Sequence, residues 1–215
     1  YYTDRAGISL DKVASMCDEL LAQYTGLKKV LIVPPDYTRC YSFAGEITKI
    51  LYPRLKAMGA EVKVMPALGT HMPVSPEEKQ KFFGDVVPDE DILVHHWQSD
   101  TTVLGKVPQE VVGMANYSKN LFVGLGGRAM INKSHMLSAI CGMEQALGVR
   151  DCPARVLYDY AQQHFIDGKL PVVFLQTVTT RENDVTSLNG LYIGDSRVPF
   201  EKACELAQEL NIVHV

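Results

Sequence analysis

The sequence predicts an α/β fold with a mainly parallel sheet and helices on both of its faces. Strand-like runs alternate with helix-like runs from residue 10 to residue 96, and this βαβ rhythm is typical of parallel sheets. The chain has 215 residues, of which 47% are hydrophobic. That is enough for one ordinary domain with its own core, or for one large and one small lobe. We therefore expect a Rossmann-like arrangement.

The first half of the chain predicts its elements in order. Residues 10–24 place apolar side chains at helical spacing, and Gly26 follows as a stop. The run KKVLIVPP at residues 28–35 is typical of a buried strand ended by two prolines. The next helix has Ser42 as its candidate N-terminal cap and Gly59 as its C-terminal cap.

The rest of the chain continues this pattern less clearly. The predicted elements are a strand at residues 61–68, a helix at 75–83, a strand at 91–96, a loop at 98–108, a short strand with a glycine turn at 120–127, helices at 134–147 and 153–167, a strand at 170–179, a helix at 199–210 and the start of a strand at 211–215. Because the chain stops in a strand, we expect more protein to follow.

Composition excludes several classes of protein. The net charge is −4 and the pI is about 5.9, without a basic stripe, which disfavours nucleic acid as a partner. No apolar run is long enough to cross a membrane, and no signal peptide is visible. The five cysteines are odd in number and form no CxxC pair, which favours reduced thiols in the cytoplasm over disulfides or a zinc site.

Two polar segments follow predicted strands. Asp36-Tyr-Thr-Arg39 comes after the first strand and Gly69-Thr-His71 after the second. Both should lie at the carboxyl edge of the sheet, where α/β proteins bind ligands. Arg39 can grip a carboxylate or phosphate with two parallel hydrogen bonds, and His71 can exchange a proton near neutral pH. The alternatives are a surface loop with an Asp–Arg pair and a loop histidine without a role.

Three further parts of the sequence contain residues that could take part in chemistry, but their sequence patterns are weak. Lys119 could carry a covalent cofactor and His135 could bind a metal, although a solvated lysine and a histidine near a helix start explain them equally well. His95 and His96 are adjacent in a predicted strand and should point to opposite faces, which disfavours a two-histidine chelate. The glycines at 124–127 match no nucleotide-binding motif and favour a tight turn.

Taken in order, these segments resemble the lactate racemase family that uses a nickel-pincer nucleotide. Asp36-Tyr-Thr-Arg39 looks like the family's DxTR motif and Gly69-Thr-His71 like its GTH motif. Residues 108–113 resemble its PHxxxG segment. Lys119 falls at the position of the cofactor-holding lysine, and His135 at that of the nickel ligand. The order of the motifs is more specific than any one of them, and the resemblance runs from about residue 28 to residue 148.

The resemblance implies an isomerase, a racemase or epimerase of 2-hydroxy acids, with residues 1–215 as its N-terminal catalytic and cofactor-binding domain. Lys119 would tether the cofactor through a thioamide and His135 would ligate nickel in a square plane. Asp36 and Thr38 would contact the nucleotide part. His71 would take the hydroxyl proton while hydride leaves the substrate's Cα, and Arg39 would clamp the carboxylate.

The sequence departs from the family at three points. Gln109 stands where the family has a second acid–base histidine, and glutamine cannot take a proton. This disfavours symmetric two-base racemisation of lactate and favours a related activity, such as racemising or epimerising a different, for example more polar, hydroxy acid. The stretch from Gly105 to Gln109 is short, which suggests missing residues near Val107–Pro108. The family's C-terminal domain, an expected partner, is absent, so we expect this chain alone to be inactive. A catalytically inactive nucleotide- or hydroxy-acid-binding member, or an ordinary α/β binding domain, remains the alternative.

Overall fold

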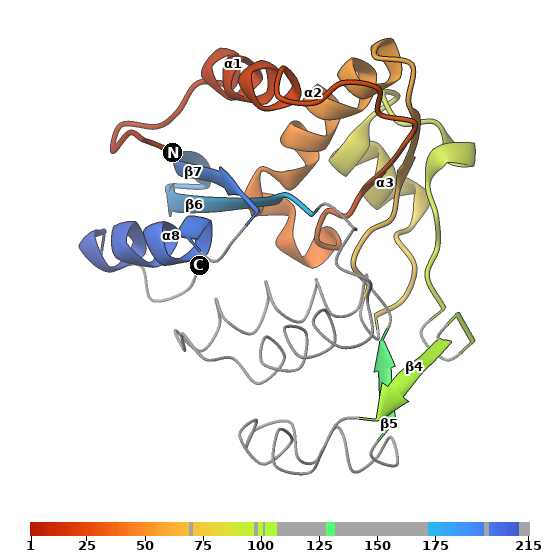
Figure 1. Cartoon of the computed structure of the whole chain (residues 1–215). Helices are drawn as coiled ribbons and strands as arrows, with labels where there is room; N and C mark the ends of the chain where they lie inside the picture. The colour runs from red at the N-terminus through yellow and green to blue at the C-terminus, as the bar shows by residue number, and fades with distance from the viewer. Residues whose placement is uncertain are drawn as a thin grey trace. The chain divides into compact units, whose positions relative to one another are not determined.

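A computed structural model describes most of the first half of the chain and a second stretch near its end. The described residues are 1–68, 71–96, 99–100, 102–106, 128–131, 172–195 and 198–210 (Figure 1). The chain divides into two compact units. Unit 1 comprises residues 1–66, 72–94 and 173–215, and unit 2 comprises residues 67–71 and 95–172.

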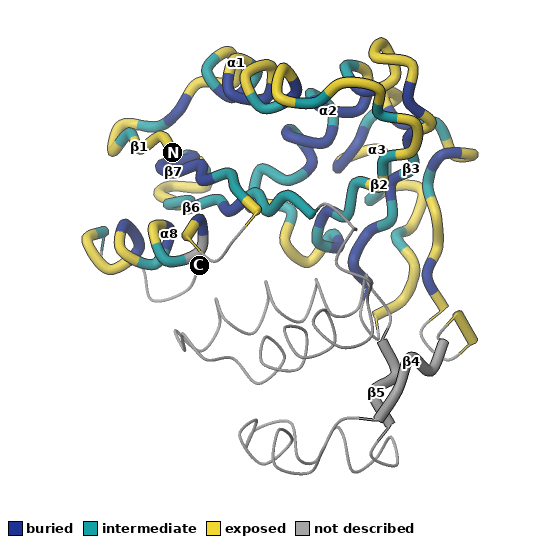
Figure 2. The backbone as a smooth tube through the Cα atoms, viewed as in Figure 1, coloured by how far each residue is buried: buried dark blue, intermediate teal, exposed yellow. Residues whose placement is uncertain are grey.

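Helix α1 (Leu10–Leu21) confirms the first predicted element of unit 1. Ser9 caps it by accepting a hydrogen bond from the backbone N–H of Lys12. One face is buried, including the fully buried Val13 and Cys17, whereas the other is exposed (Figure 2). Burial raises the pKa of the Cys17 thiol to about 11, so this thiol is inert at neutral pH.

Strands β2 (Lys29–Ile32) and β3 (Glu61–Val64) form a parallel pair, with Lys29 opposite Glu61. Helix α2 (Ala44–Ala57) connects them and packs on both, so this part is the predicted βαβ unit. The third predicted strand is reduced to one parallel bridge between Val64 and Ile92, after the 3₁₀ helix η2 (Asp89–Asp91).

The ends of the helices in unit 1 test the capping predictions. Gly59 follows α2 with a φ of 84°, as expected of a residue that ends a helix. Ser42 is not the N-cap of α2: Phe43 is, in a left-handed conformation, and the Ser42 hydroxyl accepts from the Ala44 N–H instead. Helix α3 (Pro76–Phe83) starts with a capping box formed by Ser75 and Glu78.

The remainder of unit 1 is an antiparallel sheet, in the order β1 (Tyr2–Thr3), β7 (Val185–Gly194) and β6 (Phe174–Glu182). Helix α8 (Val198–Glu209) packs on β6 and β7. Strand β6 and helix α8 were predicted, but β7 was not. The turn between the strands uses Asn183 and Asp184, both at positive φ, which is typical of a two-residue hairpin.

A bulge in β7 explains how this sheet joins the main core. The pairing shifts between Val178 and Thr179 of β6, where Asn189 is the extra residue of β7. Because of the bulge, Leu188 and Leu191 both reach the core formed with α1, α2, α3 and β3, although they are three residues apart. Val178 and Tyr192 belong to a second cluster with α8.

Unit 2 contains an antiparallel pair, β4 (Thr102–Lys106) and β5 (Arg128–Ile131). The prediction of a loop at residues 98–108 is therefore wrong for β4, whose pairing is interrupted by a shift between Val103 and Gly105. β5 was not predicted. The predicted elements at 120–127, 134–147, 153–167 and 211–215 lie outside the described residues.

The described strands thus form a mixed α/β structure rather than a clearly parallel sheet. The described pairings are one parallel pair, one antiparallel pair and one three-stranded antiparallel sheet. The expectation of a mainly parallel sheet came from the βαβ rhythm of residues 10–96, and it did not include the antiparallel hairpin of β6 and β7. Within the described part of the chain, no helix is long and apolar enough to cross a membrane.

A charge network fastens η2 to α2 and β3. The Asp91 carboxylate accepts hydrogen bonds from the Tyr52 hydroxyl, from Lys56 Nζ at 3.1 Å and from Lys63 Nζ at 2.6 Å. The bond from Lys63, followed by that from Tyr52, lowers the pKa of the Asp91 carboxyl well below its usual range. Burial and the same carboxylate raise the pKa of Tyr52 to about 12.

We expect Asp91→Asn to lower the free energy of unfolding by about 2 kcal/mol at pH 7, because two ammonium groups and a hydroxyl lose a charged acceptor. A lowered folded-state pKa stabilises the fold above the ordinary carboxyl pKa of about 3.9, and this stabilisation is lost as the pH falls below it. The difference between wild type and variant, measured by urea unfolding, should therefore shrink between pH 5 and pH 2. Asp89→Asn in the same 3₁₀ helix removes a carboxylate that is exposed and paired with Lys79 at the surface, and is the control. An equal effect of both substitutions would contradict a special role for Asp91.

Candidate functional site

The Asp36–Arg39 segment forms the start of a 3₁₀ helix, η1 (Tyr37–Ser42), that begins five residues after β2 ends. Asp36 is its N-cap and is buried. Its Oδ1 accepts hydrogen bonds from the backbone N–H of Thr38 at 3.1 Å and from the Thr38 hydroxyl. The backbone N–H of Thr38, in the first turn of η1, is therefore already used by Asp36.

Arg39 differs from its neighbours because its side chain is exposed and makes no hydrogen bond or ion pair with the rest of the described chain. Its backbone N–H donates to the Asp36 carbonyl at 3.0 Å, while its φ of −107° and ψ of 33° depart from helical values. The described contacts thus do not support the alternative of an Asp36–Arg39 pair. A guanidinium in this position can bind a carboxylate or phosphate with both of its parallel N–H groups.

Unit 1 holds η1 from the side of α3. The ring of Tyr37 meets that of Phe82 edge to face, with centroids 6.1 Å apart. Gly45, in the first turn of α2, lies so close to Phe82 that an added Cβ would be 2.4 Å from the Phe82 carbonyl oxygen. A larger residue at position 45 would therefore displace the segment that carries Arg39.

His71 lies in unit 2, seven residues after β3 ends. Its side chain is exposed, and its backbone N–H donates to the Leu68 carbonyl at 2.8 Å. Leu68 is buried, so the backbone of His71 is hydrogen-bonded to a residue that is packed in the structure. Gly69 and Thr70 lie outside the described residues. Because Arg39 belongs to unit 1, the convergence of Arg39 and His71 stays a prediction.

Unit 2 also contains the adjacent His95 and His96, which lie near an aspartate, Asp100, that the sequence did not predict as their partner. His95 is buried and His96 is exposed, as expected for adjacent residues of an extended segment. Asp100 Oδ2 accepts from the His96 N–H at 2.8 Å and lies 3.2 Å from His96 Nδ1 and 3.8 Å from His95 Nδ1. Burial lowers the pKa of His95, so this imidazole is neutral at pH 7. The backbone N–H of His96 lowers the pKa of Asp100.

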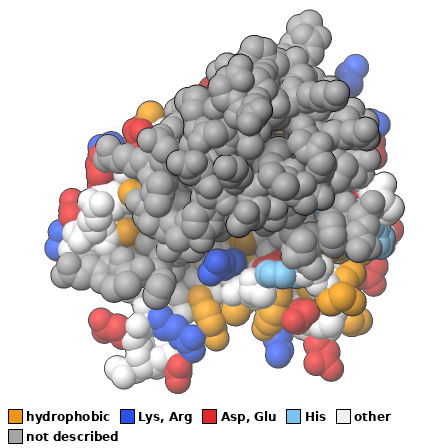
Figure 3. Space-filling model, turned by 90° about the horizontal axis from the view of Figure 1, so that it is seen from below, with side chains coloured by type: hydrophobic (Ala, Val, Ile, Leu, Met, Phe, Trp, Pro, Cys, Tyr) orange, Lys and Arg blue, Asp and Glu red, His pale blue; other side chains and the backbone are white. Residues whose placement is uncertain are grey.

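The other predicted site residues, Gln109, Lys119 and His135, lie outside the described part of the chain, and their roles stay predictions. Among the described residues, no group of three or more histidine, cysteine, aspartate or glutamate side chains could hold a metal ion. On the face drawn in Figure 3, the visible described side chains of both charge signs are interspersed with hydrophobic ones.

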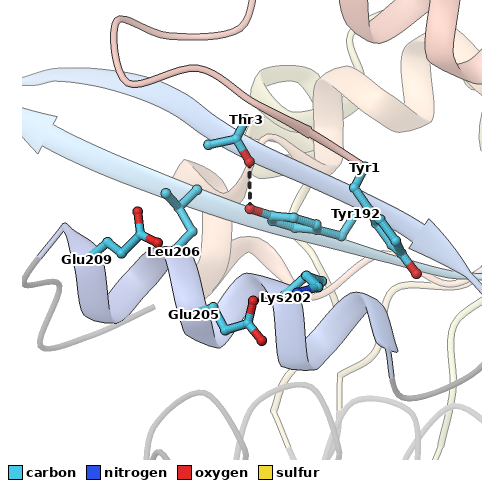
Figure 4. Close-up of a pocket in the computed structure, with 7 residues that line it drawn as sticks. All are labelled: Tyr1, Thr3, Tyr192, Lys202, Glu205, Leu206 and Glu209. Carbon is cyan, nitrogen blue, oxygen red and sulfur yellow. Dashed lines mark hydrogen bonds and ion pairs between the residues drawn. The ribbon is translucent and has the colours of Figure 1, made fainter.

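A pocket of about 210 Å³ lies between the β1–β7 edge and α8 (Figure 4). Thr3 and Tyr192 meet there through their hydroxyls at 2.9 Å. Its two carboxylates are already paired, Glu205 with Lys202 and Glu209 with Arg5. Of the predicted site residues that unit 1 describes, Asp36, Thr38 and Arg39 do not line this pocket, so it does not support the predicted chemistry.

The family of this region follows from comparison with known proteins. Residues 12–112 match the lactate racemase N-terminal domain. The resemblance deduced from the order of the motifs is thereby confirmed for this region. The lactate racemase N-terminal match contains Asp36–Arg39, His71 and Gln109, whereas Lys119 and His135 lie beyond it. The curated proteins include no match to the chain.

Two solved structures resemble the chain. A protein from Thermotoga maritima is 21% identical, with a TM-score of 0.71 over 97% of this chain and 61% of its own. The lactate racemase apoprotein from Thermoanaerobacterium thermosaccharolyticum is 18% identical, with a TM-score of 0.57 over 94% of this chain and 56% of its own. At these identities the likeness concerns the fold. The chain spans about three fifths of the length of both structures.

Proposed function

We propose that this chain provides the substrate-binding part of a racemase or epimerase that acts on a 2-hydroxy acid. The observation that carries the proposal is the Arg39 side chain, exposed and without a partner among the described residues, on a segment that lies within the lactate racemase N-terminal match. A guanidinium of this kind suits a carboxylate, the group that all 2-hydroxy acids share.

We infer a Rossmann-like sheet as the frame of this site. The parallel β2–β3 pair joined by α2, together with the parallel bridge from Val64 to Ile92, supports this inference. In such a frame, the segments that leave the carboxyl ends of β2 and β3 carry Arg39 and His71.

In the proposed reaction, Arg39 binds and orients the substrate carboxylate. His71 accepts the proton of the substrate hydroxyl at a ring nitrogen and later returns it, while the bound cofactor would supply the acceptor and donor for the hydride of Cα. Gln109 can hydrogen-bond the hydroxyl but cannot exchange its proton. This asymmetry disfavours symmetric two-base racemisation of lactate and favours the isomerisation of a different, for example more polar, hydroxy acid.

The cofactor proposed from the family resemblance is a nickel-pincer nucleotide, which supplies a hydride acceptor and donor when it is bound. Lys119 would hold it covalently and His135 would be the nickel ligand. Thr38 is exposed and can turn its hydroxyl to the nucleotide only by leaving Asp36, because the two are hydrogen-bonded to each other. Asp36 is also the N-cap of η1, so its carboxylate is already in use and supports the proposed nucleotide contact less directly than the exposed Arg39 supports carboxylate binding.

A second candidate is a family member that binds a nucleotide or hydroxy acid without turnover. Gln109 favours this candidate, because it replaces one of the two proton-exchanging groups.

We further expect activity to require the part of the related structures that this chain does not span, so that residues 1–215 alone are inactive. The thiols of Cys17 and Cys40 are free, in keeping with the cytoplasmic location that we propose.

The proposal is tested on full-length protein from cells that make the cofactor. We expect the intact mass to exceed the sequence mass by that of the tethered cofactor, with about one nickel per chain, and Lys119→Ala to lose both. Chiral chromatography after incubation with lactate, malate and other 2-hydroxy acids should show interconversion of one of them. An unmodified Lys119 in cofactor-replete protein would falsify the tethered-cofactor proposal. Binding without turnover or nickel would favour the second candidate.

A further inference from the structure

The β6–β7 hairpin contacts η1 at two points, although the hairpin and η1 are far apart in the sequence. The Thr177 hydroxyl donates a hydrogen bond to the Ser42 carbonyl at 2.9 Å, across 135 positions of sequence. The guanidinium of Arg181 lies over the ring of Tyr41, 4.1 Å from its centroid. Thr177 and Arg181 are four residues apart in β6 and therefore project from the same face of the strand.

The hairpin is a firm support for both contacts. β6 pairs with β7 from Phe174 to Glu182, including the pair Thr177–Leu191, and Leu191 is fully buried in the main core. Arg181 also donates a hydrogen bond to Asp184 in the hairpin turn, with 2.8 Å between its Nη2 and the Asp184 Oδ1. The Arg181 side chain is thus held between the turn and Tyr41.

η1 needs such support because short 3₁₀ helices have poor hydrogen-bond geometry and little stability of their own. Asp36 anchors its first turn, and the contacts of Tyr41 and Ser42 anchor its last. Arg39 lies between these anchors and has no side-chain partner among the described residues. The direction of its guanidinium therefore depends on how η1 is held at both ends.

We propose that Thr177 and Arg181 are positioning residues that fix Arg39 for carboxylate binding. This inference rests on the proposed function of Arg39 and assigns the β6–β7 hairpin a part in substrate affinity. Neither side chain contacts Arg39 in the described structure, so their influence passes through the backbone of η1. A misplaced guanidinium retains its charge but loses the alignment of its two parallel N–H groups with a carboxylate.

The first test measures η1 itself, by hydrogen exchange of full-length protein. We expect Thr177→Val to increase exchange in peptides covering residues 37–43, with α1 unchanged, and Thr177→Ser to restore protection because it retains the hydroxyl. Thr179→Val, the same substitution two positions along β6, is the matched control. Unchanged exchange at residues 37–43 in Thr177→Val overturns the proposal.

The second test is a double-mutant cycle on the binding of lactate and malate, measured by calorimetry. We expect Thr177→Val, and likewise Arg181→Met, to weaken binding about fivefold in the wild-type background. In the Arg39→Lys background the same substitutions should weaken binding less than twofold, because the bidentate guanidinium whose orientation they fix has been removed. Equal losses in both backgrounds overturn the positioning role. If the wild type binds neither acid, the proposed function has failed, and the hydrogen-exchange result alone decides whether the hairpin holds η1.

Discussion

Arg39→Ala is expected to lower kcat/KM of the full-length enzyme for its 2-hydroxy acid by about 10²- to 10³-fold, because two charge-assisted hydrogen bonds to the carboxylate are lost. Most of this loss should come from a higher KM, since the carboxylate is bound equally in the ground state and the transition state. The free energy of unfolding should remain within about 0.5 kcal/mol of wild type, because the side chain is exposed and has no described partner.

Two companion variants make this expectation specific. Arg39→Lys retains the charge without the planar fork and should recover only part of the activity. Arg5→Ala removes another exposed arginine, one that pairs with Glu209, and should leave kcat/KM unchanged. Initial rates over a range of hydroxy-acid concentrations, with urea unfolding of each variant, provide the measurements. A value of kcat/KM for Arg39→Ala within twofold of wild type would exclude Arg39 from carboxylate binding.

The elements that could be predicted from sequence are those whose signals are local. The capping box of Ser75 and Glu78, the apolar spacing of α1 and the β-branched run of β2 each lie within a few residues of the structure they specify. β7 was missed because it includes Ser187, Asn189 and Gly190, and the bulge at Asn189 breaks the alternation that identifies a strand.

The same distinction applies to the candidate site. Arg39 and His71 were found because each follows a strand, and the motif order pointed to a family that residues 12–112 do match. Thr177 and Arg181 could not be found, since a hydrogen bond across 135 positions has no local signal. Asp100 was missed for a related reason: nothing in its neighbourhood shows that its carboxylate will meet both His95 and His96.

Gly45→Ala is expected to destabilise unit 1 by about 3 kcal/mol, although alanine is the better helix former by about 1 kcal/mol. An added Cβ would lie 2.4 Å from the Phe82 carbonyl oxygen and 2.6 Å from Cδ2 of its ring. A side chain can change rotamer, but a backbone carbonyl in α3 cannot move without shifting the helix. The overlap therefore outweighs the gain in helix propensity.

The effect should be compared with Gly59→Ala, at the other end of α2. Gly59 has a φ of 84° and no atom within 4 Å of an added Cβ, so its substitution costs only backbone strain, about 1 kcal/mol. Urea unfolding should therefore rank Gly45→Ala well below Gly59→Ala in stability. Because α2 follows directly from η1, we also expect faster hydrogen exchange at residues 37–43 in Gly45→Ala but not in Gly59→Ala. Equal stability of the two variants would mean that α2 and α3 can separate at little cost, and Arg39 would then lack a rigid support on the Phe82 side.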